Sequence, residues 1–237
     1  MNQSKVRYGI LGFGRFAERT IAPAFRASPN AELLAIQKRS LKEAREMGKS
    51  LSIPLAFDSA EKLVSHPEID AVFIVSANAL HCPETLAAAA AGKHVLVEKP
   101  MGLSAAECRT MIDACRRNGV KLMVGHMVRF SPLVRRMKEI IHSGALGPVV
   151  LAKSEFIYDS RLSHRSWLFD TKLAGGGPVF DVGVHCLDTM RFLLDDEVVS
   201  TKSQTDFRQP ENRTESTASL SLKFSKGTIG SITCTYA

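Results

Sequence analysis

The first half of the chain alternates short apolar runs with stretches of helical character, and this alternation restricts the possible folds more than any other feature. Apolar runs typical of strands cover residues 6–11, 32–37, 71–75, 94–97 and 121–124. Helices are expected between them, over residues 15–27, 42–51, 83–91 and 105–118. The fully apolar run 71–75 indicates a strand buried on both faces. Repeated strand–helix units of this kind predict an α/β fold with a doubly wound parallel sheet.

The pattern changes after about residue 125. Apolar and polar residues alternate along 218–224 and again along 232–236, which predicts an antiparallel hairpin with one covered face. A helix that begins at Ser131-Pro132 has apolar residues at helical spacing, namely Leu133, Met137, Ile140 and Ile141. We therefore expect one domain over residues 1–125, and an α/β domain with an open, mainly antiparallel sheet over residues 126–237.

The composition excludes several classes of protein. Of the 237 residues, 45% are hydrophobic and 23% are charged, as in an ordinary soluble globular protein. The net charge of +7 comes from scattered basic residues, and the cluster of Arg135, Arg136 and Lys138 has the spacing of a solvated helix face. We therefore expect no nucleic-acid partner, and a positive charge that favours a phosphate-bearing small ligand.

The five cysteines are odd in number and form no CxxC pair, which indicates reduced thiols in place of disulfides or a zinc site, and we expect no metal. The sequence begins directly with a strand and shows no apolar segment typical of a signal peptide. No apolar run approaches the length of a membrane span. We therefore expect a cytoplasmic protein without a membrane partner.

The segment Gly12-Phe13-Gly14-Arg15-Phe16-Ala17 forms a GxGxxA motif directly between the first strand and the first helix. The first glycine of such a turn permits the tight bend, the second lets a pyrophosphate approach the backbone, and the small third residue lets helix and strand pack closely. The helix N-terminus adds free N–H groups for the anion. Between a strand and a helix, the motif predicts that the first domain binds a dinucleotide.

The end of the second strand distinguishes NADP from NAD. NAD-binding proteins usually have an acidic residue about 20 residues after the glycines, where it binds the ribose 2′-hydroxyl. This chain has Lys38, Arg39 and Ser40 there, without a carboxylate. A guanidinium binds phosphate oxygens in bidentate fashion, so we interpret these residues as a 2′-phosphate site and expect NADP. The alternative is that they are exposed loop residues.

Glu98-Lys99-Pro100 follows the strand at residues 94–97 and is expected at the carboxyl edge of the sheet, where ligands bind. Pro100 restricts Lys99 to an extended conformation. A preorganised ammonium at this edge can polarise a substrate oxygen or donate a proton. The alternative is that Lys99 is a solvated turn residue.

A second candidate group lies in the second half of the chain. Because Pro178 suits a helix start, Asp181 and His185 are expected one turn apart on one helix face, with Asp188 three residues further on. A carboxylate beside an imidazole orients the ring and favours its protonated form, as in general acid–base pairs. The alternative is an Asp181 that interacts with the helix dipole, and a histidine without a role.

Together, these motifs and their order resemble the Gfo/Idh/MocA family of oxidoreductases along essentially the whole chain. The resemblance includes the segments SANALHCPETLAAAAAGKHVLVEKP, VGHMVRFSP and AGGGPVFDVGVHCLD. It implies a Rossmann domain that binds NAD(P), followed by an α/β domain for substrate and oligomer contacts with a large open antiparallel sheet. Family chains usually continue beyond the point where this one stops, so the second sheet is expected to be incomplete.

The resemblance also implies roles for single residues. The family's catalytic group matches Lys99, Asp181 and His185. Residues implied to contact the cofactor, besides those of the glycine-rich turn and the 2′-phosphate site, are Ala77, Asn78, His81, Glu98 and Lys99. Residues implied to border the substrate pocket, besides His185, are Arg129 and Trp167.

The function that the resemblance implies is an NADP-dependent oxidoreductase acting on a sugar, a polyol or a related hydroxy or carbonyl compound. Its assembly is expected to be a homodimer or a homotetramer. Two alternatives are a non-catalytic NADP-binding regulator, and a redox-neutral enzyme such as a glycoside hydrolase that oxidises and re-reduces its substrate.

Overall fold

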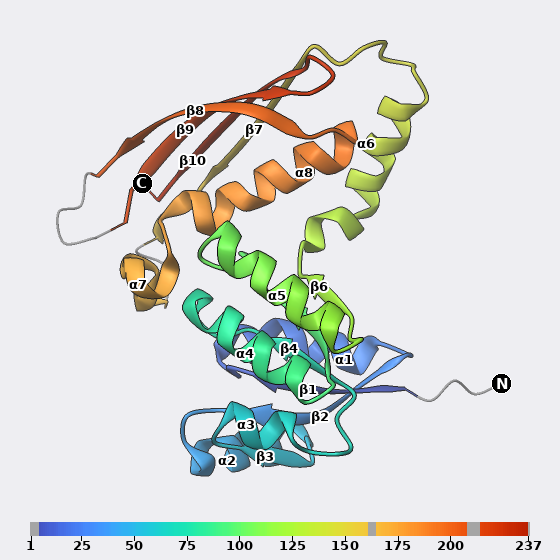
Figure 1. Ribbon diagram of the computed structural model, residues 1–237, viewed down its shortest axis with the longest axis vertical. Coiled ribbons are helices and arrows are strands. Elements are labelled where there is room, and N and C mark those ends of the chain that lie inside the picture. The colour runs from blue at the N-terminus through green and yellow to red at the C-terminus, as the bar shows by residue number, and fades with distance from the viewer. Residues whose placement is uncertain (1–4, 161–164, 208–213, 237) are drawn as a thin grey trace. The chain divides into compact units, whose positions relative to one another are not determined.

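The computed structural model describes residues 5–160, 165–207 and 214–236 (Figure 1). The chain divides into two compact units, which we call the N-terminal unit, residues 1–125, and the C-terminal unit, residues 126–237. Each unit has a sheet and a hydrophobic core of its own.

The N-terminal unit contains a six-stranded parallel sheet with the strand order β3-β2-β1-β4-β5-β6. The strands are β1 (Val6–Leu11), β2 (Ala31–Gln37), β3 (Leu55–Phe57), β4 (Ala71–Ile74), β5 (His94–Val97) and β6 (Leu122–Val124). The strand order reverses between β1 and β4, which are neighbours. Ligands of such sheets bind outside the carboxyl ends of the strands at this switch point.

Helices cover both faces of this sheet. They are α1 (Ala22–Ala27), which continues a π-helical turn at Ala17–Ile21, α2 (Leu41–Leu51), α3 (Ala60–Val64), α4 (Asn78–Ala90) and α5 (Ala105–Arg117). In β1 the neighbours Ile10 and Leu11 are both fully buried, but Ile10 packs toward α1 and α2, and Leu11 toward α3, α4 and α5. Because successive strand residues point to opposite faces, covering both faces requires continuous apolar runs. The predicted doubly wound sheet is confirmed.

Two details of this unit differ from the prediction. Helix α4 begins at Asn78, five residues earlier than expected, and contains Pro83. A proline is favoured in the first helical turn, so its position suggested a later start. The short elements β3 and α3 were not predicted, because three and five residues are too few to establish a periodicity.

The C-terminal unit contains a four-stranded sheet with the order β7-β10-β9-β8. The strands are β7 (Leu151–Ile157), β8 (Val198–Asp206), β9 (Thr217–Phe224) and β10 (Ile229–Thr235). The β9–β10 hairpin and the β8–β9 pair are antiparallel, whereas β7 and β10 are parallel. This confirms the prediction of a mainly antiparallel sheet.

Helix α8 (Val184–Leu194) covers one face of this sheet (Figure 1). Cys186 and Met190 of the helix pack with Leu222, Phe224 and Ile232 of the hairpin strands, and all five are buried. A π-helical turn at Val179–Gly183 precedes α8, and the unit also contains α6 (Pro132–His142) and α7 (Thr171–Ala174). Helix α6 begins where it was predicted, but none of its residues is buried, and Leu133 is 70% exposed.

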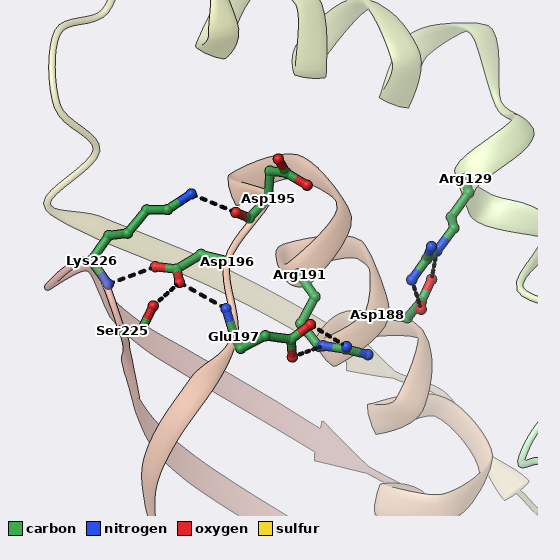
Figure 2. A network of polar contacts seen from close by, with 8 residues as sticks. All are labelled: Arg129, Asp188, Arg191, Asp195, Asp196, Glu197, Ser225 and Lys226. Atoms are coloured by element: carbon green, nitrogen blue, oxygen red, sulfur yellow. Dashed lines mark hydrogen bonds and ion pairs between the residues drawn. The ribbon is translucent and has the colours of Figure 1, made fainter.

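A polar network joins the end of α8 to the β9–β10 hairpin (Figure 2). The Asp196 carboxylate accepts hydrogen bonds from the Ser225 hydroxyl and from the Lys226 backbone N–H, the latter at 2.9 Å. The Lys226 ammonium donates to the carbonyl oxygen of Asp195 at 2.6 Å. The hairpin turn is therefore held directly against the last turn of the helix.

Candidate active site

The carboxyl edge of the N-terminal sheet brings three turns together. In the strand register Leu11 lies beside Ile74, and Ile74 beside Val97, so β1, β4 and β5 end at the same level. The turns that follow are the glycine-rich turn, the segment 75–78 and the segment 98–100. This edge carries most of the residues predicted to bind cofactor.

The glycine-rich turn has space on its outer side. Gly12 has φ +77°, and a Cβ on it would lie 2.6 Å from the Cα of Ser76, so only glycine fits. Gly14 is exposed, and a Cβ there would meet nothing closer than the Gly12 oxygen at 3.8 Å. The Phe13 side chain is buried in the core, whereas Arg15 and Phe16 are exposed. This arrangement fits a pyrophosphate approaching the backbone at Gly14.

Gln37, at the end of β2, fixes this turn and was not singled out from the sequence. Its side-chain oxygen accepts the Gly12 N–H at 3.0 Å, and its backbone carbonyl accepts the Phe13 N–H at 2.9 Å. A polar residue in a strand has no distinctive signal in the sequence. Its position immediately before the Lys38-Arg39-Ser40 segment is the one clue that could have found it.

The predicted 2′-phosphate residues follow Gln37. The Lys38 ammonium lies 3.4 Å from the Phe13 carbonyl oxygen and 3.6 Å from the Glu43 carboxylate. Arg39 is exposed. The Ser40 hydroxyl accepts the Glu43 N–H at 3.4 Å and caps α2. Lys38 and Arg39 therefore offer positive charge beside the glycine-rich turn, while Ser40 also has a structural role.

The first turns of α4, which follow β4, carry two buried polar side chains. Ala77 precedes α4, and Asn78, its first residue, is 5% exposed. His81 has no exposed surface, and its ring nitrogens lie 2.8 Å from the Pro100 carbonyl oxygen and 3.2 Å from that of Ser76. His81 thus lies behind the edge, where its ring contacts backbone oxygens of two of the turns.

Glu84 is a half-buried acidic group behind this edge. Its carboxylate accepts a hydrogen bond from the Ser76 hydroxyl at 2.7 Å. Burial raises the pKa of the Glu84 carboxyl to about 7, although the Ser76 hydrogen bond acts in the opposite direction. Neither Ser76 nor Glu84 was found from the sequence, because isolated Ser and Glu residues are common on solvated helices and turns.

Lys99 lies in a turn held by backbone contacts. The Glu98 N–H donates to the Ile74 carbonyl oxygen at 2.9 Å, and the Lys99 N–H donates to the Glu98 carboxylate at 3.2 Å. A Cβ on Gly125, which follows β6, would lie 3.2 Å from this carboxylate. The Lys99–Pro100 peptide bond is cis, and Lys99 itself is half-buried. Lys99 thus lies at the carboxyl edge.

In the C-terminal unit, Asp181 is 4% exposed and binds an arginine and a tyrosine. Its carboxylate accepts hydrogen bonds from the Tyr158 hydroxyl at 2.7 Å and from the Arg165 guanidinium at 3.0 and 3.1 Å. Burial and the Asp181 charge raise the pKa of Tyr158, so this hydroxyl stays protonated and donates. Neither Arg165 nor Tyr158 was predicted as a partner of Asp181, because both come from segments without a motif of their own.

His185 lies in the first turn of α8 among aromatic rings. Its ring centroid is 6.5 Å from that of His126, edge to face, and 6.2 Å from that of Phe156. The His126 Nδ1 lies 3.7 Å from the carboxylate of Asp188. Two imidazoles and a carboxylate therefore occupy one region of this unit.

The two predicted substrate residues have partners within the C-terminal unit. Arg129 forms a bidentate ion pair with the buried Asp188 at 2.7 and 2.5 Å (Figure 2), and its guanidinium lies 5.5 Å from the centre of the Phe192 ring. The half-buried Trp167 lies under the Arg165 guanidinium at 5.9 Å. The carboxylate of Asp188, the last residue of the Asp181–Asp188 motif, therefore fixes the position of the Arg129 guanidinium.

The described residues contain neither a membrane-spanning helix nor a metal-binding cluster. Among residues 5–160, 165–207 and 214–236, no helix has both the length and the apolar character needed to cross a bilayer. Over those ranges, no three or more His, Cys, Asp or Glu side chains come together in a way that could hold a metal ion.

Comparison with known proteins agrees with this architecture. Residues 6–126 match an oxidoreductase family model with an NAD-binding Rossmann fold, and residues 134–237 match the GFO/IDH/MocA C-terminal domain. The chain is 33% identical to mouse trans-1,2-dihydrobenzene-1,2-diol dehydrogenase over 97% of its own length and 68% of that protein's. It is 38% identical to D-xylose 1-dehydrogenase (NADP(+)) 2 of Haloferax volcanii, over 84% of this chain and 61% of that one.

A solved structure agrees as well. The aldose-aldose oxidoreductase from Caulobacter crescentus, complexed with glycerol, superposes with a TM-score of 0.91 and 31% identity, over 98% of this chain and 71% of that one. This chain thus spans roughly two thirds of the length of its relatives. On the sequence matches and the shared fold, the chain belongs to the Gfo/Idh/MocA family of NAD(P)-dependent oxidoreductases.

Proposed function

We propose that this protein is an NADP-dependent oxidoreductase that transfers a hydride between nicotinamide and the CH–OH carbon of a sugar, a polyol or a related diol. One observation carries the proposal: the glycine-rich turn follows β1 and Lys99 follows β5, so both lie at the carboxyl edge of one sheet with only β4 between their strands. A dinucleotide and a cationic group that can act on a substrate oxygen are thereby assigned to one edge.

The cofactor is assigned to the carboxyl edge of the N-terminal unit. Gly12 permits the tight turn against Ser76, Gly14 leaves the space that a pyrophosphate needs, and Arg15 and Phe16 begin the helix whose N–H groups face it. Ala77, Asn78 and Glu98 follow β4 and β5, the strands on the far side of β1 from Lys38, and are assigned to the nicotinamide half. When bound, the nicotinamide supplies or accepts the hydride.

The choice of NADP over NAD rests on charge. Lys38 and Arg39 lie at the end of β2, where an NAD site would have a carboxylate for the ribose 2′-hydroxyl. The exposed Arg39 guanidinium is suited to bidentate binding of a 2′-phosphate. One relative of this chain has NADP(+) in its name, which agrees with the assignment.

The reaction is assigned to Lys99, His185 and Asp181. Lys99 holds and polarises the reacting oxygen, and His185 takes or gives the hydroxyl proton. Asp181 contributes by fixing Arg165 and Tyr158 beside α8, and Arg165 in turn contacts Trp167. Trp167 and Arg129 are assigned to the border of the substrate pocket.

The substrate class follows the relatives, whose names specify a dihydrobenzenediol, D-xylose and aldoses. All are small and bear hydroxyl or carbonyl groups on adjacent carbons. We extend this class to the present chain, acting as a homodimer or homotetramer.

Thermal shift with NADP, with NAD and with neither tests the cofactor assignment. NADP is expected to raise the Tm more than NAD, because at equal concentration the ligand with the lower Kd stabilises the native state more. A ligand present at about 100 times its Kd stabilises it by about 2.7 kcal/mol. Arg39→Ala should weaken NADP binding about tenfold and leave NAD binding unchanged, as expected for one lost charge-assisted contact. Arg45→Ala, which removes an exposed arginine of α2, is the control.

The activity is tested with D-xylose, other aldoses, polyols and trans-dihydrodiols, following the absorbance of NADPH. Consumption or formation of NADPH with one of these compounds supports the proposal. A folded protein whose Tm responds to neither dinucleotide contradicts it. Binding of NADP without turnover of any compound would favour the non-catalytic regulator.

A further inference from the structure

One buried histidine bridges the ends of two neighbouring strands. His81 lies in the second turn of α4 and has no exposed surface. Its Nδ1 lies 2.8 Å from the carbonyl oxygen of Pro100, after β5, and its Nε2 lies 3.2 Å from the carbonyl oxygen of Ser76, after β4. The ring therefore connects the Lys99 turn with the segment beside the glycine-rich turn.

The protonation state of His81 decides which contact is stronger. Burial lowers the pKa of His81 and the charge of Lys99 lowers it further, against the effect of the two carbonyl oxygens. A neutral imidazole has one N–H and can donate to only one of the two oxygens. The shorter distance assigns that N–H to Nδ1, so the firmer bond is the one to Pro100, the residue after Lys99.

The other end of the bridge is also fixed. A Cβ on Gly12 would lie 2.6 Å from the Cα of Ser76, so the backbone of Ser76 packs directly against the glycine-rich turn. Its hydroxyl donates to the half-buried Glu84 carboxylate at 2.7 Å, and Val75 donates its N–H to the Leu11 carbonyl oxygen at 3.0 Å. Ser76 is thus held by β1 on one side and by α4 on the other.

We propose that His81 is a positioning residue, which holds the Lys99–Pro100 turn at a fixed distance from the glycine-rich turn and so places the Lys99 ammonium relative to a dinucleotide bound there. The inference rests on the proposed function, in which Lys99 acts on the reacting oxygen. It assigns His81 to the support behind the edge, in place of the direct cofactor contact that the family resemblance implied.

The kinetic test compares His81→Leu with His81→Gln. Leucine removes both bonds, and kcat is expected to fall about a hundredfold, the cost of a displacement of about 1 Å in a catalytic group. The Kd for NADP should change less than about threefold, because the Gly12 turn keeps its own backbone contacts to Gln37. Glutamine can donate to the Pro100 oxygen and should recover most of kcat.

His94→Leu is the matched control. His94 lies at the opposite end of β5, is exposed, and accepts the Lys121 N–H at 3.0 Å. The control should leave kcat within about twofold, as is usual for a surface substitution. Equal losses of kcat and NADP affinity in His81→Leu, without recovery by glutamine, would overturn the proposal, as would an unchanged kcat.

A second readout does not depend on activity. Labelling with acetic anhydride, followed by mass spectrometry, measures the reactivity of each lysine amine. In His81→Leu the released turn should make Lys99 react about threefold faster relative to Lys121, because local opening exposes the amine, and His81→Gln should restore the original ratio. If the wild type turns over no substrate, the proposed function fails, and an unchanged Lys99 ratio then separately overturns the role of His81.

Discussion

The two units of this protein hold their candidate functional groups in different ways. At the N-terminal edge, the backbone does most of the positioning: a glycine at φ +77°, the aligned ends of three parallel strands, and carbonyl oxygens bound by His81. In the C-terminal unit, buried carboxylates hold long cationic side chains, Asp181 with Arg165 and Asp188 with Arg129. The first arrangement leaves local motifs in the sequence, whereas the second depends on distant pairs.

The difference predicts how each region responds to substitution. A backbone-defined edge should lose a specific function when one side chain is removed, with little loss of stability. A site built from buried ion pairs should lose stability when one partner is removed, because the other charge is left uncompensated. Four substitutions test this contrast, in order of decreasing effect.

Lys99→Met should have the largest effect. Removing the ammonium is expected to reduce kcat about a thousandfold, within the range for loss of a positioned acid–base or polarising group. The Kd for NADPH and the Tm should remain close to those of the wild type, because the turn is held by backbone bonds of Glu98 and by His81. Lys62→Met, which removes an exposed lysine paired with Asp58, is the control. Near-normal turnover in Lys99→Met would remove Lys99 from the mechanism.

Gly12→Ala tests whether the backbone defines the cofactor turn. Both a positive φ and a contact of 2.6 Å with the Cα of Ser76 oppose the new Cβ, and the free energy of unfolding should fall by about 3 kcal/mol, with loss of NADP binding. Gly92→Ala is the matched control, since Gly92 has φ +71° but nothing within 4 Å of its added Cβ. The strain of the positive φ should lower its free energy of unfolding by only about 1 kcal/mol, and NADP binding should remain intact. Equal effects at the two sites, measured by urea unfolding, would contradict this account.

Asp181→Asn tests the ion-pair side of the contrast. The substitution leaves Arg165 without its carboxylate, and because the Arg165 side chain is 41% exposed, the cost should be about 2 kcal/mol, less than for a fully buried pair. Thermal and urea unfolding measure it. Asp195→Asn is the control, because the exposed Asp195 takes part in the hairpin network through its backbone oxygen. A loss of activity without any change in stability would instead indicate a direct role of Asp181 in the chemistry.

Glu84→Gln should give the smallest effect, and one that depends on pH. The folded-state pKa of about 7 lies above the usual value of about 4.3, so the native state binds more protons than the unfolded state between these pH values. Wild-type stability should therefore fall as the pH rises through this interval. Glutamine still accepts the Ser76 hydrogen bond without ionising, so the variant should be more stable than the wild type by about 1–2 kcal/mol at pH 8.

Urea unfolding between pH 5 and 8 measures this difference. Glu46→Gln, which changes an exposed residue of α2, should leave the pH dependence of the wild type unchanged. If Glu84→Gln keeps the wild-type slope, Glu84 is ionised in the native state over this whole interval, and its carboxylate is solvated.

The N-terminal edge was largely predictable from sequence, because its features are local. The positions of Gly12 and Lys99 at strand ends follow from the apolar runs before them, and the parallel sheet brings those ends together. Gln37 and Ser76 were missed, because single polar residues that bind backbone groups leave no pattern. His81 was found, but its burial behind the edge depends on the α4 helix starting earlier than its proline suggested.

The C-terminal site was less predictable, because its contacts join distant segments. Asp188 binds Arg129 across 59 positions of sequence, and Asp181 binds Arg165 across 16. The helical spacing of Asp181 and His185 predicted a pair, but spacing does not reveal that a cation from another loop also binds Asp181. The hairpin was predicted from its alternation, whereas the parallel partner of β10 was not, since nothing in β7 specifies its direction.

The parallel pairing of β7 with β10 has a consequence for folding. Leu151 lies beside Ile229, so this contact closes a loop that contains about two thirds of the described residues of the C-terminal unit. Contacts of such long range slow folding, because the entropy of loop closure is lost before the contact forms. The N-terminal unit is completed by β6 at residue 124 and can fold while the ribosome is still making the rest of the chain. We therefore expect the dinucleotide-binding half to be available to its ligand before the sheet of the second half has closed.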